Sequence, residues 1–157
     1  MRTIDQLIAD APVFAGLERS QLELIAGCGH NEHVAAGTLL LREGDPADTF
    51  FLLRSGAVAL EVHAPARPPM RIETLAPGDV VGWSWLFAPY RWHLDARALE
   101  ACGLVAFDGA CLRSKCEQDH ELGYQLMSRF AAALVDRLQA TRFQLLDVYG
   151  GAVAAAG

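Results

Sequence analysis

The residues best suited to chemistry gather in one short stretch, 82–93, which holds all three tryptophans of the chain. Phe87, Tyr90 and His93 stand beside the tryptophans, and Arg91 is the one Lys or Arg of the stretch. Rings at this density either stack on a planar ligand or fill a cavity with apolar area. Arg91 is suited to pairing with an anion, although an exposed arginine on a loop is usually only solvated. The stretch is therefore the candidate ligand-binding segment.

The histidines and carboxylates do not form a metal-binding pattern. His30-Asn-Glu-His33 lacks the H-x-H pair of cupin-type metal barrels, and no later carboxylate and histidine have the spacing of those sites. Cys116 and His120 would share a face of one helix, but Cys111 would point elsewhere. The sequence also lacks a phosphate-binding glycine loop, a nucleophile elbow and a kinase signature. We expect no metal site and no catalytic residue, with a cupin-like metalloenzyme as a remote alternative.

The four cysteines carry no recognisable framework. Cys28, Cys102, Cys111 and Cys116 contain no CxxC pair and no spacing typical of a disulfide-rich secreted chain. We expect four free thiols, mostly buried, with neither a disulfide nor a cluster among them.

Short apolar runs between turn residues predict an antiparallel barrel over about 30–108. The expected strands are 38–42, 49–54, 57–63, 70–75, 80–81, 94–99 and 104–107, separated by glycine, proline and aspartate turns. Two short helices should precede them, over about 3–9 and 21–27, the second with a capping box from Ser20 to Glu23.

Helix formers replace the turn residues after Asp108 and predict helices over about 110–118 and 121–148. The second helix carries the a/d seam of a coiled coil, made of Met127, Ala131, Leu134, Leu138, Thr141, Leu145 and Val148. Such a seam favours a parallel homodimer, while packing of the helix on its own barrel is the alternative. Residues 150–157 are expected to form a flexible tail after a single domain over 1–149.

Composition and charge limit the class of protein. The chain has 157 residues, of which 52% are hydrophobic and 20% charged, so one folded domain is expected. We see neither a secretion signal nor a membrane-spanning run, which favours the cytoplasm. The net charge of -6 is the wrong sign for neutralising phosphates along a duplex. Neither a nucleic acid nor a membrane is an expected partner.

Several glycine turns, in their order along the chain, resemble those of the cyclic nucleotide-binding domain family. Phe14-Ala-Gly-Leu17 resembles the family's opening, and 41–48 with Ser55-Gly56 resembles its first hairpin. Pro77-Gly78-Asp79-Val-Val-Gly82 resembles the approach to the phosphate-binding cassette. The resemblance covers nearly the whole chain and is to the ligand-binding half of catabolite activator protein-like regulators. It implies an α+β fold, a double-stranded β-helix or jelly roll with short N-terminal helices and a long C-terminal dimerisation helix.

In that family, backbone amides and an arginine hold an anionic phosphate, and a glutamate accepts from the ribose hydroxyl. The cassette of this chain departs from the pattern, because Trp83 stands at the glutamate position and Trp92 at the arginine position, with Arg91 one residue early. The resemblance makes Gly82, Ser84 and Trp85 the candidate amide donors. The candidate ligand contacts are therefore Gly82, Trp83, Ser84, Trp85, Arg91, Trp92 and His93.

The long helix adds Thr141 and Arg142, because 137–142 resembles the activator's stretch in which a threonine and its successor contact the adenine. Thr141 also lies on the seam, where a polar residue can set the register of paired helices. No winged helix-turn-helix is expected after Val148, from which nine residues remain.

We therefore expect a sensory or regulatory domain and no enzyme, with no cofactor beyond a cyclic nucleotide or another anionic or aromatic ligand. The first alternative is a degenerate barrel that binds no ligand and serves as a protein-interaction subunit.

Overall fold

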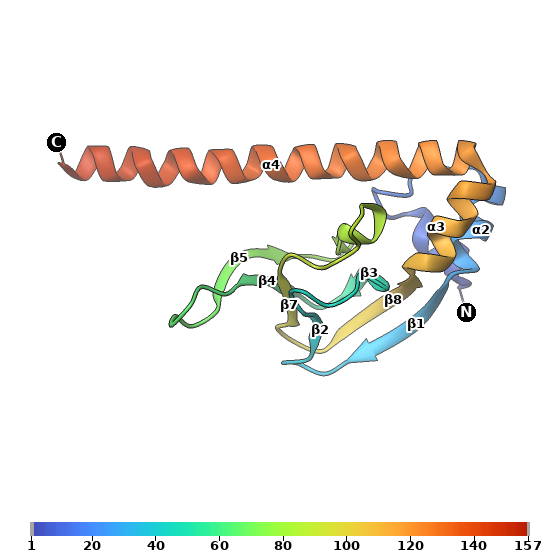
Figure 1. Cartoon of the computed structure of the whole chain (residues 1–157), viewed down its shortest axis with the longest axis horizontal. Coiled ribbons are helices and arrows are strands. Elements are labelled where there is room, and N and C mark those ends of the chain that lie inside the picture. The colour runs from blue at the N-terminus through green and yellow to red at the C-terminus, as the bar shows by residue number, and fades with distance from the viewer. Residues whose placement is uncertain (1, 157) are drawn as a thin grey trace.

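Two four-stranded antiparallel sheets form the body of the domain, and one long helix crosses over them (Figure 1). The computed structural model describes residues 2–156, and the side chains of these except Gln144 and 148–156. The first sheet has the order β1 (Gly29–Val34), β8 (Cys102–Asp108), β3 (Thr49–Ser55), β6 (Val80–Val81). The second has the order β2 (Leu39–Leu41), β7 (Asp95–Ala98), β4 (Val58–Val62), β5 (Met70–Leu75). The predicted α+β jelly-roll fold is confirmed.

Seven of the eight strands were predicted within one or two residues, whereas β1 was missed. Its sequence, Gly-His-Asn-Glu-His-Val, contains no apolar run, and no residue of it is fully buried. β1 forms a strand because it pairs along its length with the buried β8, with His30 opposite Ala106. Its position at the edge of the sheet allows its side chains to be polar. Tertiary pairing overrides a polar sequence at this position.

The helices are α1 (Ile4–Ala9), α2 (Arg19–Ala26), the single 3₁₀ turn η1 (Ser84–Leu86), α3 (Gly109–Gln118) and α4 (His120–Ala156). The predicted cap of α2 is wrong: Glu18, not Ser20, is the N-cap, and its amide donates to Gln21 Oε1 at 3.0 Å. α4 runs past the predicted end at Val148, while the flexibility expected of 150–157 stays a prediction. None of the described helices is long and apolar enough to cross a bilayer.

A cluster of aromatic rings joins the barrel to α4. Phe50 of β3 stacks between Trp85 and Phe107, with ring centroids 4.3 and 4.9 Å away. Phe130 of α4 stands edge-on to Trp85 at 5.4 Å and to Phe50 at 6.1 Å. Each such contact contributes about 0.5–1.5 kcal/mol beyond the area it buries. Together with the buried Leu122 and Leu126, Phe130 seats the first part of α4 on the barrel, and the helix then extends well beyond it (Figure 1).

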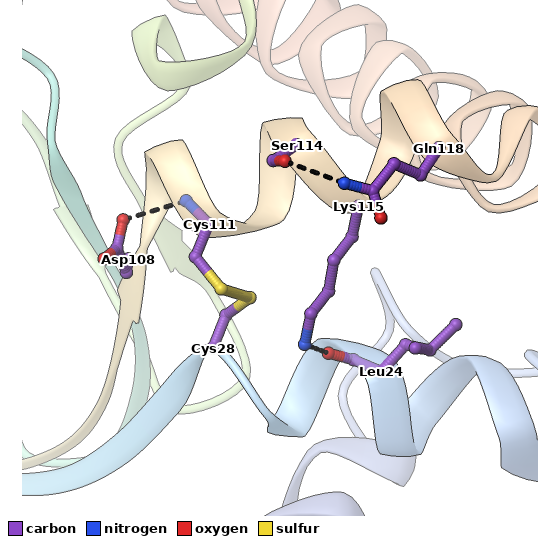
Figure 2. Close-up of a disulfide and its surroundings, with 7 residues drawn as sticks. All are labelled: Leu24, Cys28, Asp108, Cys111, Ser114, Lys115 and Gln118. Atoms are coloured by element: carbon purple, nitrogen blue, oxygen red, sulfur yellow. Dashed lines mark hydrogen bonds between the residues drawn. A yellow bond between two sulfur atoms is a disulfide. The ribbon is translucent and has the colours of Figure 1, made fainter.

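The expectation of four free thiols is wrong for one pair. Cys28, between α2 and β1, forms a disulfide with Cys111 of α3, 83 residues later in the chain (Figure 2). This pair could not be predicted from cysteine spacing, because the fold alone brings the first turn of α3 beside the end of α2. Lys115 adds a second link between the two helices, donating to the Leu24 carbonyl at 2.7 Å. Cys102 and Cys116 are free.

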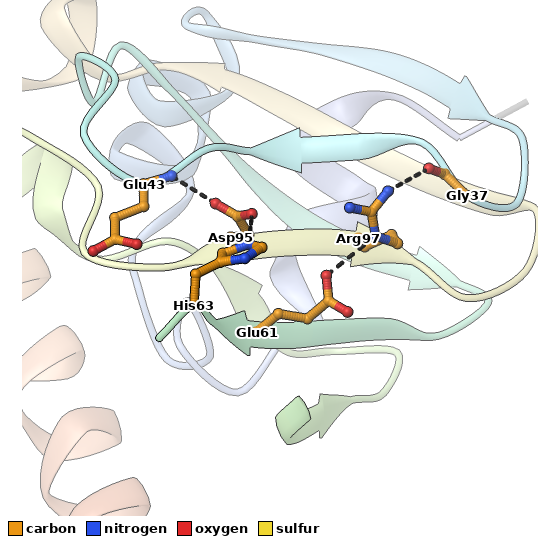
Figure 3. Close-up of polar contacts among 6 residues, drawn as sticks. All are labelled: Gly37, Glu43, Glu61, His63, Asp95 and Arg97. Carbon is orange, nitrogen blue, oxygen red and sulfur yellow. Dashed lines mark hydrogen bonds and ion pairs between the residues drawn. The ribbon is translucent and has the colours of Figure 1, made fainter. Parts of the chain in front are cut away.

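A polar network joins residues of β4, of β7 and of the turn after β2 (Figure 3). Asp95 is buried, accepts from the Glu43 amide at 2.7 Å and lies 2.5 Å from His63 Nε2. Burial alone would raise the pKa of Asp95, but the Glu43 amide, the His63 ring and the charge of Arg97 hold that pKa below its ordinary value of 3.8. Arg97 in turn pairs with Glu61 at 3.1 Å. This network joins β7 to β4 and to the turn after β2.

Removing the disulfide should destabilise the domain. Because the bond closes a loop of more than 80 residues, the double variant Cys28→Ser/Cys111→Ser should lose about 2–5 kcal/mol in free energy of unfolding, measured by urea denaturation. Cys116→Ser is the matched control on the same helix, and its loss should stay under about 1 kcal/mol. Equal stability of the double variant and the wild type would refute a contribution from this bond.

Asp95 should make stability depend on acidity. Because its pKa is lower in the folded than in the unfolded chain, its contribution is complete above about pH 4 and is lost as the pH falls through the folded value. Asp95→Asn should therefore cost about 1–3 kcal/mol at pH 6, with the gap to wild type narrowing in acid. The exposed Asp10→Asn serves as control. A variant as stable as wild type at pH 6 would contradict the role given to this network.

Candidate functional site

A cavity of about 320 Å³ lies between the segment 82–93 and α4. Its base is buried and consists of Leu41, Leu60, Gly82 and Trp92. The remaining lining residues are Trp83, Ser84, Phe87, Ala88, Pro89, His93, Leu94 and Leu134, the last from α4. No carboxylate, ammonium or guanidinium group is among the lining residues. The cavity thus has an apolar base, a partly exposed rim and one wall supplied by the long helix.

The segment 82–93 leaves the barrel at Gly82 and returns against the turn 44–47. Gly82 has φ +103°, a conformation that side-chain-bearing residues rarely adopt, so glycine is needed there. The return is held by backbone bonds: the Ala47 amide donates to the Tyr90 carbonyl at 2.7 Å, and the Trp92 amide to the Asp45 carbonyl at 3.1 Å. These bonds determine where the ring of Trp92 lies.

Trp92 packs directly on Gly82. Its side chain is 5% exposed, and a Cβ added at Gly82 would lie only 2.6 Å from two carbons of the indole. The ring therefore covers one side of the Gly82 backbone and forms part of the cavity base. The predicted contacts Gly82, Trp83, Ser84, Trp92 and His93 all line this cavity.

Trp85 does not line the cavity. Its ring is fully buried in the stack with Phe50 and Phe130, and its indole N–H has no hydrogen-bond partner among the described residues. The Trp85 carbonyl accepts from Arg113 Nη1 at 2.6 Å, which ties the segment to α3. Trp85 is a core residue by its side chain.

Trp83 forms a wall between two cavities. Its ring meets Phe130 edge-on at 5.4 Å, and the guanidinium of Arg137 lies 5.4 Å above it. On the far side is a second cavity of about 300 Å³, where Arg137 pairs with Glu73 at 2.5 Å and approaches Asp79 at 3.9 Å. Arg137 of α4 is thus a contact that the sequence did not predict; it lies seven residues after the buried Phe130 and so on the same face of the helix. Charged side chains thus line this second cavity, whereas the first has none.

The remaining predicted contacts lie apart from the cavity. Arg91 is exposed and donates from Nη1 to the Gly44 carbonyl at 3.1 Å. Thr141 is exposed and donates to the Arg137 carbonyl of its own helix at 2.9 Å. It stands seven residues beyond Leu134, about 10 Å along α4, and Arg142 follows it. Within one chain the structure does not bring Thr141 and Arg142 to the segment 82–93.

The sequence pattern missed several cavity residues. Leu41 and Leu60 belong to apolar strand runs that give no sign of which side chains face a hollow, and Leu134 was seen only as a seam residue. As for metals, among the described residues no three His, Cys, Asp or Glu side chains are grouped so as to hold an ion.

Comparison with known proteins identifies the family to which this fold belongs. The family model for the cyclic nucleotide-binding domain matches residues 31–119, which is more than half of the chain. A crystal structure of a protein from Geobacter metallireducens GS-15, named for cyclic nucleotide binding, is 31% identical with a TM-score of 0.78. The match covers 88% of this chain and 99% of that one.

Two longer curated proteins also match. A CRP-like cAMP-activated global transcriptional regulator of Mycobacterium tuberculosis is 26% identical over 145 residues, 92% of this chain and 63% of that protein. Glutaminase 1 of Bradyrhizobium diazoefficiens is 31% identical over 134 residues, 83% of this chain but 21% of that protein. This chain thus spans less than two thirds of these relatives, one a regulator and one an enzyme. With its two-sheet fold and the match over 31–119, the chain belongs to the cyclic nucleotide-binding domain family and has the fold of its sensory and regulatory domains.

Proposed function

We propose that this domain is a dimeric regulatory module whose cassette has been altered so that it no longer holds a cyclic nucleotide in the usual way of the family. The observation that supports this best is the contact of the Trp92 ring with Gly82, at the cassette position where the family has its phosphate-binding arginine. An indole supplies no charge to pair with a phosphate, and here it also occupies space beside the backbone.

The energetic consequence is large. A hydrogen bond to a charged group contributes about 1.5–3 kcal/mol, so losing both the arginine and the glutamate contacts weakens binding by roughly two to four orders of magnitude. Arg91 does not replace the arginine in this arrangement, because it bonds to the Gly44 carbonyl and does not line the cavity. Trp83 occupies the position of the ribose-binding glutamate. The nearby carboxylates of Glu73 and Asp79 do not replace that glutamate, because they pair with Arg137.

The long helix supports the dimer. Its seam residues Met127, Ala131, Leu138, Thr141 and Leu145 are all exposed, next to the face that packs on the barrel. Four of these five are apolar, and in the single chain Met127, Leu138 and Leu145 are 40%, 51% and 51% exposed. A second α4 in a parallel coiled coil would bury this seam. Val148, the last predicted seam residue, lies outside the described side chains.

Leu134 connects the two parts of the proposal. It is half-buried, lines the apolar cavity and occupies the same seam as Leu138. A ligand in the cavity would therefore touch the helix that makes the dimer contact. Binding of a ligand can in this way change how the two helices pair. The same pairing could bring Thr141 and Arg142 of a second copy toward the cavity.

A domain of this kind regulates without catalysing, and its output goes to a protein partner or to further domains. The matched relatives illustrate both a transcriptional regulator and an enzyme that carries a comparable segment. The alternative of a barrel that binds no ligand at all differs only in the cavity, which would then serve as packing. We place the protein in the cytoplasm, where disulfides are rare, so the Cys28–Cys111 pair would be largely reduced there.

Cyclic AMP should bind weakly. Calorimetry on the purified protein should give a dissociation constant above about 100 µM, because both charged contacts are missing. Trp83→Glu and Trp92→Arg should each recover about 1.5–3 kcal/mol of binding free energy in a variant that remains folded. Melting curves must accompany the binding data, because removing the buried Trp92 ring costs about 3–5 kcal/mol of stability. Wild-type binding at low micromolar concentration would refute the altered cassette.

The dimer has its own test. Multi-angle light scattering at micromolar concentration should give twice the chain mass, and Leu138→Asp should give the monomer mass because it places a charge in the seam. Asp136→Lys changes charge on the same helix outside the seam and should leave the dimer intact. A monomeric wild type, or a dimer unaffected by Leu138→Asp, would contradict the seam.

A further inference from the structure

The lining of the apolar cavity limits the charge of the ligands that it can bind. Twelve residues line it, and none is Asp, Glu, Lys or Arg. An anion placed there would lose its hydration without gaining a counter-charge, which costs several kcal/mol. Since Arg91 is bonded to the Gly44 carbonyl, it does not supply that charge. The cavity offers an anion no permanent counter-charge, so it disfavours anions as a class and not only cyclic nucleotides.

The lining favours flat apolar groups. Trp83, Trp92 and Phe87 present rings, and Leu41, Leu60 and Leu134 present branched apolar groups. Phe87 is 42% exposed at the rim, so a ligand seated against it would also cover apolar surface that now faces water. Rings stacked in this way gain contact beyond the simple burial of area.

The volume gives the size of the ligand. An apolar cavity of roughly 150 Å³ is enough for one benzene ring, so the present cavity of about 320 Å³ has room for a molecule of about two rings. Besides the indole N–H groups of Trp83 and Trp92, the Ser84 hydroxyl and the His93 imidazole line the cavity. They can serve one polar substituent of a ligand.

We propose that this cavity is a binding site for an uncharged, two-ring aromatic molecule with a single hydrogen-bonding substituent. The proposal rests on the proposed function, in that the cassette is free of cyclic nucleotide. It goes further by assigning the site a ligand of a different chemical class, recognised by stacking and one hydrogen bond in place of ionic contacts.

The probes are 2-naphthol and naphthalene-2-sulfonate, which have the same ring system and differ in charge. Calorimetry should show 2-naphthol binding at least tenfold more tightly than the sulfonate. In ¹H–¹⁵N spectra, 2-naphthol should shift the indole signals of Trp83 and Trp92 and leave that of Trp85, whose ring lies in the core stack. Phe87→Ala should weaken 2-naphthol binding about tenfold. Phe143→Ala removes a ring of α4 that does not line the cavity and is 67% exposed, so it should leave binding unchanged.

Each result decides the proposal. Absence of 2-naphthol binding, equal affinity for the sulfonate, or shifts confined to residues outside the cavity would overturn it. Because both varied side chains are exposed, unfolding does not obscure the comparison. A parallel titration with cyclic AMP separates the two claims: tight cyclic AMP binding overturns the proposed function, whereas weak binding of cyclic AMP and of 2-naphthol together overturns only this ligand class.

Discussion

The contact of Phe130 with Trp83 and Trp85 is the interaction on which the other parts of this domain depend. One ring of α4 stands edge-on to both tryptophans, at 5.4 Å from each. Through Trp85 it reaches the barrel core, and through Trp83 it reaches the cavity wall. Together with Leu122 and Leu126 it seats α4, and so it helps to keep Leu134 at the cavity and Arg137 beside Glu73 and Asp79. The aromatic residues of the cassette thus hold the long helix as well as forming a pocket.

The sequence was sufficient for the barrel because strand periodicity and glycine turns are local signals. It failed where a partner distant in the chain decides the structure. β1 is polar and forms a strand by pairing with β8, and Cys28 meets Cys111 because the fold brings α3 beside the end of α2. Neither the β1–β8 pairing nor the disulfide can be recognised from a short stretch of sequence.

The candidate site was predicted only in part, for the same physical reason. The sequence placed Trp83 and Trp92 at ligand-contact positions and Trp85 among the amide donors, but it did not show that the Trp85 ring belongs to the core while the other two line the cavity. The difference arises in the 3₁₀ turn Ser84–Leu86, which directs the Trp85 ring at Phe50. Arg91, the charge that seemed most suited to a ligand, is held by the Gly44 carbonyl. Leu41, Leu60 and Leu134 became site residues only when the strands and α4 enclosed a volume.

We propose that the Trp92 ring on Gly82 is the structural reason why this cassette excludes an anionic ligand. The most direct test is a crystal structure of the protein grown with millimolar cyclic AMP. We expect the indole to remain on Gly82, with no phosphate bound at the amides of Gly82 and Ser84. A phosphate at those amides, with Trp92 displaced and the Arg91 guanidinium turned onto it, would contradict the account.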